Sequence, residues 1–251
     1  MRGAPRRDAA FTVVDVLVTI VVIAILVGIL LPSMASVRES TRRVLCGSGE
    51  RQITIGLAMY ANEQRGALPS SEYFYVPSTA GDSTGTRGQA VALSQLDTLR
   101  ISKGRDARGN RVAVWDGLGK LYATEVLPAS KLFYCPSQRG NRGFEAVASQ
   151  WLSPYTELRG NFHMRPVGPS GERAWWQLEG RHVTVLSDSL SSKDTLNHEA
   201  GFNIARADTS VEWFLDQDNR IGGSLPSAAA DGGGMDGNNA VWGAWNEFDS
   251  Q

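Results

Sequence analysis

The 251-residue chain has few of the side chains that bind soft metals, with two cysteines and three histidines. Composition therefore predicts no zinc site built from Cys and His alone. The chain also lacks an excess of positive charge, because 25 Lys and Arg residues stand against 26 Asp and Glu residues. That balance argues against a basic surface for nucleic acid. We expect no metal, no cofactor and no nucleic-acid partner.

One long apolar run departs from this average composition. Residues 11–31 read FTVVDVLVTIVVIAILVGILL and contain a single charged side chain, Asp15. As a helix the run would be about 32 Å long, which matches a hydrocarbon core of roughly 30 Å. The short basic segment before it favours the cytoplasmic side. We expect a single membrane-spanning segment; a cleaved secretory signal and a plain uncleaved anchor are the simpler interpretations of it.

Asp15 is the unusual residue of this run. An ionised carboxylate on a lipid-exposed helix is costly and normally needs a partner. A cut between Ala10 and Phe11 would place a new α-amine four residues before Asp15, on the same helical face. The amine of the same or a neighbouring subunit would then neutralise the carboxylate, which would link membrane insertion to assembly.

The segment 10–17 (AFTVVDVL), with Pro32 closing the apolar run, resembles the N-terminus of type IV prepilins and type II secretion pseudopilins. The resemblance implies that a prepilin peptidase cuts after Ala10 and methylates Phe11, that Asp15 guides subunit docking, and that Pro32 kinks the helix. It implies a structural subunit rather than an enzyme, with other pilin-like subunits as partners in a homo- or hetero-filament. Ala10 and Asp15 depart from the family pattern, where Gly and Glu are usual.

Later segments extend the resemblance to a prepilin-like group common in planctomycete-type bacteria. They are 115–122 (WDGLGKLY), 133–137 (FYCPS), and the pair His198 and Asp208, which is close to that group's His-x9-Asp-Gly motif with Thr209 in place of Gly. One interpretation is that His198 and Asp208 hydrogen-bond across two strands and orient the turn. A partly exposed histidine at a strand entry is the other.

The whole pattern predicts an α+β, pilin-like fold, in which a long N-terminal helix packs on an antiparallel β-sheet head. Its expected parts are a leader (1–10), a transmembrane helix (11–32), an amphipathic continuation (33–66), a head (67–225) and a Gly-, Asn- and Trp-rich tail (226–251). The N-terminus is expected in the cytoplasm, and the head in the periplasm or outside the cell.

Local patterns carry narrower predictions. The continuing helix has an apolar stripe through Val44, Ile53 and Leu57. Residues 70–110 read mostly as loop, with a short helix at 89–99. Residues 202–214 read as a β-hairpin, in which a Thr at the turn predicts a longer or bulged turn rather than a two-residue one.

Cys46 and Cys135 are predicted to form a disulfide. Cys46 would lie about 21 Å beyond the membrane end of a straight helix, where a head would pack. Such a head lies in an oxidising compartment, and a bond closing so long a loop would stabilise it. Two separate buried thiols are the alternative.

An enzyme and a calcium protein are weaker interpretations. Ser83 lies in a G-x-S-x-G pattern, and Ser83, Asp188 and His198 follow the chain order of α/β-hydrolases. The strand that should precede the serine is missing, so a flexible loop explains the pattern better. Residues 216–223, with Asp216 and Asp218, resemble a Ca²⁺ loop faintly but lack the closing Glu, so a solvated turn is expected.

The tail places three aromatic residues, Trp242, Trp245 and Phe248, on one side of a short helix. Docking on the domain's own core is the first interpretation. An exposed patch for a partner or a glycan is the second, and it belongs to the rival function, a monomeric membrane-tethered extracytoplasmic binding module.

Overall fold

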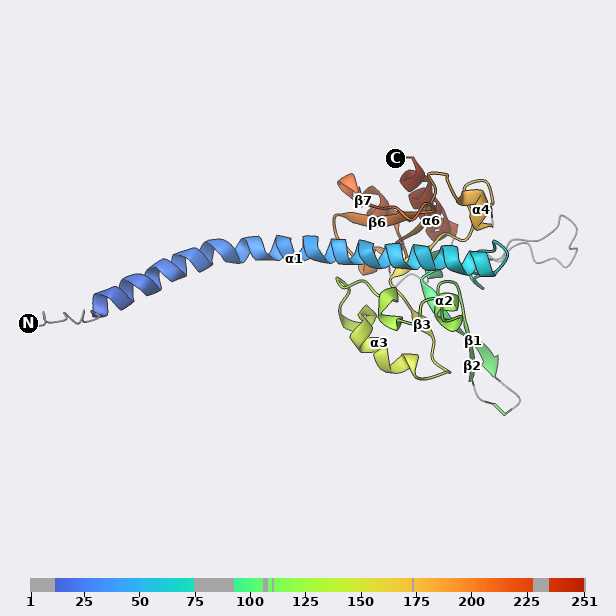
Figure 1. Ribbon diagram of the computed structural model, residues 1–251, viewed down its shortest axis with the longest axis horizontal. Helices are drawn as coiled ribbons and strands as arrows, with labels where there is room; N and C mark the ends of the chain where they lie inside the picture. The colour runs from blue at the N-terminus through green and yellow to red at the C-terminus, as the bar shows by residue number, and fades with distance from the viewer. Residues whose placement is uncertain are drawn as a thin grey trace, which may run out of the picture. The chain divides into compact units, whose positions relative to one another are not determined.

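The computed structural model describes residues 12–74, 93–105, 108–109, 111–172, 174–227 and 235–250. The chain forms two compact units, Met1–Thr41 and Arg42–Gln251, and helix α1 (Val13–Glu63) contributes to both. The predicted α+β class is confirmed, because an N-terminal apolar helix is followed by antiparallel sheets and further helices (Figure 1).

The first unit holds a helix segment that is long and apolar enough to cross a membrane. Val13–Leu31 has a mean hydropathy of 3.1, and none of it is buried. A reciprocal cap explains where the helix begins. The Thr12 N–H donates to Asp15 Oδ2 at 3.0 Å, and the Asp15 N–H donates to Thr12 Oγ1 at 3.2 Å. The backbone is helical at Pro32, whose side chain lies outside the described residues, so the kink stays a prediction.

In the second unit, α1 buries one face. Its buried side chains are Thr54 and a series at steps of three or four residues, Cys46, Glu50, Ile53, Leu57 and Ala61. The predicted stripe is therefore right at Ile53 and Leu57 but wrong at Val44, which is 73% exposed. The buried face includes Gly47 instead. A Cβ added at this glycine would lie 3.2 Å from side-chain atoms of Asn203 and Val211. This glycine allows two strands to approach the helix closely.

Two antiparallel sheets follow along the chain. The first has the order β2-β1-β3, and its strands are β1 (Thr98–Arg105), β2 (Arg111–Trp115) and β3 (Leu158–Arg159). The second has the order β4-β5-β6-β7, and its strands are β4 (Phe162–Met164), β5 (Thr184–Asp188), β6 (Gly201–Arg206) and β7 (Val211–Leu215).

Strand β1 corrects the predicted helix at 89–99. A 3-10 turn, η1 (Leu93–Gln95), precedes it, and the chain is extended from Thr98. Residues 75–92, with Ser83, lie outside the described set. The hydrogen bonds of β1 go to β2 and β3, which are later in the chain, so local pattern alone could not reveal the strand.

The predicted hairpin is confirmed as β6 and β7, paired from Gly201 with Leu215 to Ala205 with Val211. The Arg206 N–H donates to the Ser210 carbonyl at 2.9 Å, so three residues make the turn. Thr209 takes a φ of 68°. The longer turn expected from this threonine is the one observed.

The shorter elements are α2 (Gly119–Ala123), η2 (Ser130–Phe133), η3 (Gly140–Arg142), α3 (Phe144–Trp151), α4 (Trp175–Leu178), η4 (Lys193–Thr195), η5 (Gln217–Asn219), α5 (Arg220–Ser224) and α6 (Met235–Asp249). In the view of Figure 1, the second-unit part of α1 has β6, β7, α4 and α6 on one side and α2, α3 and the first sheet on the other. The buried face of α1 joins both sides into one hydrophobic core with Phe133, Trp151 and Phe162.

A second hydrophobic core lies between α6 and the second sheet. Trp245 and Phe248 are fully buried there, against Phe202 and Phe214. This confirms that the tail docks on its own domain. The tail aromatics at these two positions are not an exposed patch, and the tail belongs to the same compact unit as the head.

Candidate functional site

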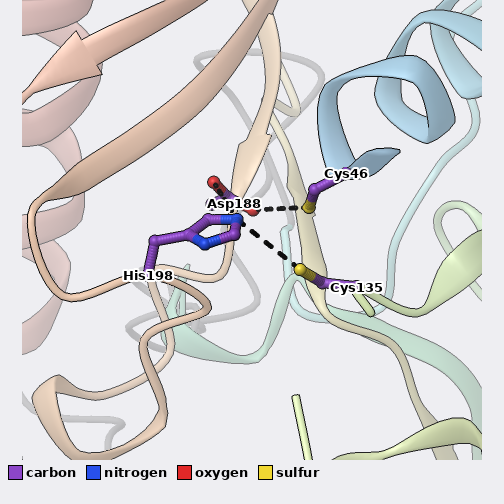
Figure 2. A group of neighbouring side chains, drawn as sticks. All are labelled: Cys46, Cys135, Asp188 and His198. Carbon is purple, nitrogen blue, oxygen red and sulfur yellow. Dashed lines mark hydrogen bonds and ion pairs between the residues drawn. The ribbon is translucent and has the colours of Figure 1, made fainter. Parts of the chain in front are cut away.

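Four ionisable side chains from four separate segments meet in the second unit (Figure 2). They are Cys46, Cys135, Asp188 and His198, and one ligand atom from each lies within 4.8 Å of those of the other three. Cys46 comes from the buried face of α1, and Cys135 follows η2. Asp188 ends β5, and His198 precedes β6. All four are buried, so the cluster lies inside the domain rather than on its surface.

Asp188 and His198 take part in three contacts within the cluster. The Cys46 thiol donates to Asp188 Oδ1 at 3.2 Å. His198 Nε2 lies 3.6 Å from Cys135 Sγ and 3.9 Å from Asp188 Oδ2. A single ring nitrogen therefore faces both a sulfur and a carboxylate, as Figure 2 shows.

Asp188 is held in place by two asparagines. Asn197 Nδ2 donates to Oδ1 at 2.6 Å, and the Asn203 N–H donates to Oδ2 at 2.6 Å. Burial raises the pKa of this carboxyl, although His198 and the hydrogen bonds act in the opposite direction. The hydrogen bonds from the two asparagines fix the orientation of the Asp188 carboxylate.

The two thiols differ in acidity. Burial, together with a hydrogen bond to Cys135, raises the pKa of Cys46 well above its ordinary value. Burial also acts to raise the pKa of Cys135, but hydrogen bonds from Cys46 and His198 outweigh it and lower that pKa to about 6. Cys135 is thus the more acidic thiol of the pair.

Glu50 adds a further buried acid. It lies one helical turn after Cys46, is fully buried, and neither of its carboxylate oxygens has a hydrogen-bond partner within the described residues. Burial, with the negative charges of Asp188 and Cys135, raises its pKa well above the usual range. The region therefore gathers several acids in a low-dielectric interior.

This geometry suits metal ligands better than a catalytic relay. In a nucleophile–imidazole–carboxylate relay the two partners bind opposite nitrogens of the ring. Here Cys135 and Asp188 both face His198 Nε2. Cys135 is also only 2% exposed, which excludes direct attack on a bulky substrate in this conformation.

Two predicted pairings are corrected. Cys46 and Cys135 are neighbours, as predicted, but both are free thiols and no disulfide joins them. Asp208 lies in the exposed β6–β7 turn and accepts hydrogen bonds from Ser210, whereas His198 is buried before the other end of β6. The six residues of β6 rise about 20 Å, so the interpretation that His198 bonds Asp208 is wrong. The other interpretation, a partly exposed histidine, is wrong as well, because His198 is buried.

The remaining sequence candidates have structural roles or lie outside the described residues. Asp216 accepts the N–H groups of Ile221 at 3.0 Å and Gly222 at 2.8 Å, so its carboxylate caps α5. Asp15 shares the reciprocal cap that begins α1. Ala10 and Phe11 lie outside the described residues, so their processing stays a prediction.

A cavity of about 610 Å³ borders the cluster. Cys46, Cys135, Tyr134, Gln138 and Phe144 are among its lining residues. Both cysteines of the cluster thus border the cavity, whereas Asp188 and His198 are not among its lining residues. The cavity is the side from which an ion or small molecule would approach.

No family model, curated protein or solved structure matches the chain. The cluster and its surroundings therefore carry the functional argument by themselves. Sequence reasoning singled out all four residues, but in three separate hypotheses and not as one site, and it missed Glu50. The useful signal was the four-residue spacing of Cys46 and Glu50, which places both on the buried helix face.

Proposed function

We propose that this protein is a prepilin-like structural subunit of a bacterial inner membrane. In this proposal a prepilin peptidase removes residues 1–10 and methylates Phe11, and the mature chain assembles with other pilin-like subunits into a type II secretion or type IV pilus-like filament. Helix α1 is the observation that carries the proposal. From Val13 to Leu31 it is apolar and unburied, and this stretch has a single carboxylate, Asp15, in the first turn.

The apolar helix surface needs a partner. Large apolar side chains between Val13 and Leu31 are about half exposed or more, which water does not tolerate over such a length. Lipid covers them in an isolated subunit, and neighbouring helices cover them in a filament. In this proposal one helix, α1, has two roles. Its apolar first part is the membrane anchor, and its later part belongs to the core of the head.

Asp15 supplies the specific contact. It accepts one hydrogen bond from its own Thr12 through Oδ2, and a carboxylate has about four acceptor sites. Room remains for the amine of Phe11 from a neighbouring subunit. Pairing the two charges removes the cost of a carboxylate in lipid, so assembly is favoured over the isolated anchor.

Intact-mass spectrometry of the protein from its native membrane is the first test. We expect a chain that begins at N-methylated Phe11. In the same membranes, crosslinking should give a ladder of oligomers for the natural chain and a monomer for Asp15→Ala. Thr19→Ala, on the same helix, is the matched control and should keep the ladder. A chain that retains Met1–Ala10 and gives no ladder would contradict the proposal.

A monomeric membrane-tethered binding module is the second candidate. The observation that favours it is the cavity beside Cys46 and Cys135, because its volume of about 610 Å³ is in the range of small-molecule sites. This candidate predicts a chain that keeps Met1–Ala10 and is monomeric, and it predicts that Asp15→Ala leaves the oligomeric state unchanged. The two measurements above therefore separate the candidates.

A further inference from the structure

We propose that Cys46, Cys135, Asp188 and His198 bind one Zn²⁺ ion, which ties helix α1 to three segments of the head. The four side chains come from α1, the segment after η2, the end of β5 and the approach to β6. This site goes beyond the filament function and does not depend on it. It also revises the prediction from composition, which considered only cysteine and histidine ligands.

The distances are those of a small tetrahedron. Zn–S bonds of about 2.3 Å and Zn–N or Zn–O bonds of about 2.0–2.1 Å give edges of roughly 3.3–3.8 Å between ligand atoms. The observed separations are 3.6 Å from Cys135 Sγ to His198 Nε2 and 3.2 Å from Cys46 Sγ to Asp188 Oδ1. His198 Nε2 lies 3.9 Å from Oδ2, the other oxygen of Asp188, so closing this edge to about 3.3 Å needs a shift of roughly 0.6 Å.

The charges also call for a cation. Two thiols, the Asp188 carboxyl and the nearby Glu50 carboxyl are buried together. An isolated buried carboxylate is strongly unfavourable, and a cation beside it offsets that cost. On binding, a divalent ion would take the place of the thiol protons, so that its two positive charges lie between two thiolates and beside the Asp188 carboxylate.

The outer contacts of a metal site are already in place. Metal-binding carboxylates are normally fixed by further hydrogen bonds, and Asp188 receives them from Asn197 and Asn203. The Ser137 N–H donates to Cys135 Sγ at 3.4 Å. These donors leave the sulfur, carboxylate and imidazole atoms directed at one another.

The donor set favours zinc. Two sulfurs, one imidazole nitrogen and one carboxylate oxygen in a tetrahedral arrangement suit Zn²⁺, whereas magnesium and calcium prefer sites made of oxygen. Four protein ligands leave no open position, and all four are at most 3% exposed. The site is therefore structural rather than catalytic, and the adjoining cavity gives the ion access from the sulfur side.

Zinc and the disulfide first expected from the sequence are exclusive alternatives. A disulfide would bring Cys46 and Cys135 sulfurs to about 2.05 Å and remove both thiolates as ligands. Zinc instead keeps the sulfurs apart and uses Asp188 and His198 as its other two ligands. The free thiols of the structure are the form that binds metal.

The full chain in detergent, purified under reducing conditions without chelator, tests the site. We expect about one zinc per chain by elemental analysis. Removal of the metal with a strong chelator should lower the Tm of the head by about 10 °C, and added Zn²⁺ should restore it. A reduced chain that binds no zinc would overturn the proposal, and so would a Tm that changes with neither chelator nor added zinc. A native chain with a Cys46–Cys135 disulfide and no zinc would do the same.

Cobalt substitution identifies the ligands. Added to the metal-free chain, Co²⁺ should give tetrahedral d–d bands and a thiolate charge-transfer band. Cys46→Ser, Cys135→Ser and His198→Ala should each weaken metal binding by more than about 100-fold. His182→Ala is the matched control, because His182 is exposed and outside the cluster, and it should bind normally. Octahedral cobalt bands without a thiolate band in the natural chain would refute this coordination.

Discussion

Thr209 occupies a backbone position that glycine adopts more easily. Its φ of 68° is in the left-handed region, where a β-branched side chain crowds the following peptide. Asp208 compensates in part, because its Oδ1 accepts the Ser210 N–H at 2.9 Å and the Ser210 hydroxyl at 2.6 Å. The strain is local and belongs to the turn rather than to the site.

Replacing this residue by glycine should stabilise the protein. Thr209→Gly relieves about 1–2 kcal/mol of left-handed strain but gives up to about 1 kcal/mol back through the greater freedom of the unfolded chain. We expect a net gain of roughly 0.5–1 kcal/mol in the free energy of unfolding, measured by denaturant titration. Thr124→Gly, at a φ of −91°, is the control and should destabilise. A lower free energy of unfolding for Thr209→Gly would show that the turn is unstrained.

Helix α6 is attached to the second sheet by a charged contact as well as by its aromatic side chains. The Arg165 guanidinium, almost fully buried, donates to the Asp249 carboxylate. The other oxygen of that carboxylate accepts the Thr184 N–H at 2.8 Å. One residue at the end of α6 therefore satisfies a buried cation and a strand backbone group together.

Removing this carboxylate should loosen the helix. Asp249→Ala leaves Arg165 buried without its ion-pair partner, and we expect a loss of roughly 3 kcal/mol in the free energy of unfolding. Glu247→Ala is the matched control. It removes a surface pair with Arg220, 3.4 Å apart, and should cost about 0.5 kcal/mol or less. Equal losses for the two variants would mean that the aromatic side chains alone hold α6.

His163 links the stability of the whole domain to pH. Its Nδ1 accepts the Leu190 N–H at 3.1 Å, and its Nε2, which then carries the proton, donates to the Leu93 carbonyl at 3.0 Å. Burial lowers its pKa to about 4; Asp97 acts to raise it, and Arg142 and Arg159 act to lower it. The folded domain therefore holds this imidazole in the neutral form.

The direction of the pH effect follows from the two pKa values. Unfolded His163 takes up a proton near pH 6.5, but the folded residue does so only near pH 4. Its contribution is thus full above pH 6.5 and is lost as the pH falls to about 4, by roughly 3 kcal/mol. We expect His163→Gln to flatten the decline of unfolding free energy between pH 7 and pH 4. An unchanged slope would assign that decline to other groups.

Local residue patterns determined the parts of this protein whose causes are local. The length and apolarity of residues 11–31 predict a possible membrane span, and the structure has an unburied helix over Val13–Leu31. Alternation on both sides of the turn at 207–210 predicts the β6–β7 hairpin. The three-residue spacing of Trp245 and Phe248 predicts a helix face, and that face is buried in the second core.

Only the tertiary structure decided the features that depend on distant partners. Strand β1 exists because β2 and β3 pair with it, and its own residues read as loop or helix. Cys46 and Asp188 are 142 residues apart in the chain, so no spacing rule joins them. Packing α1 against the second sheet brings them into hydrogen-bond contact beside Cys135 and His198. The anchor is thus a property of one segment, whereas the proposed zinc site exists only once four segments fold together.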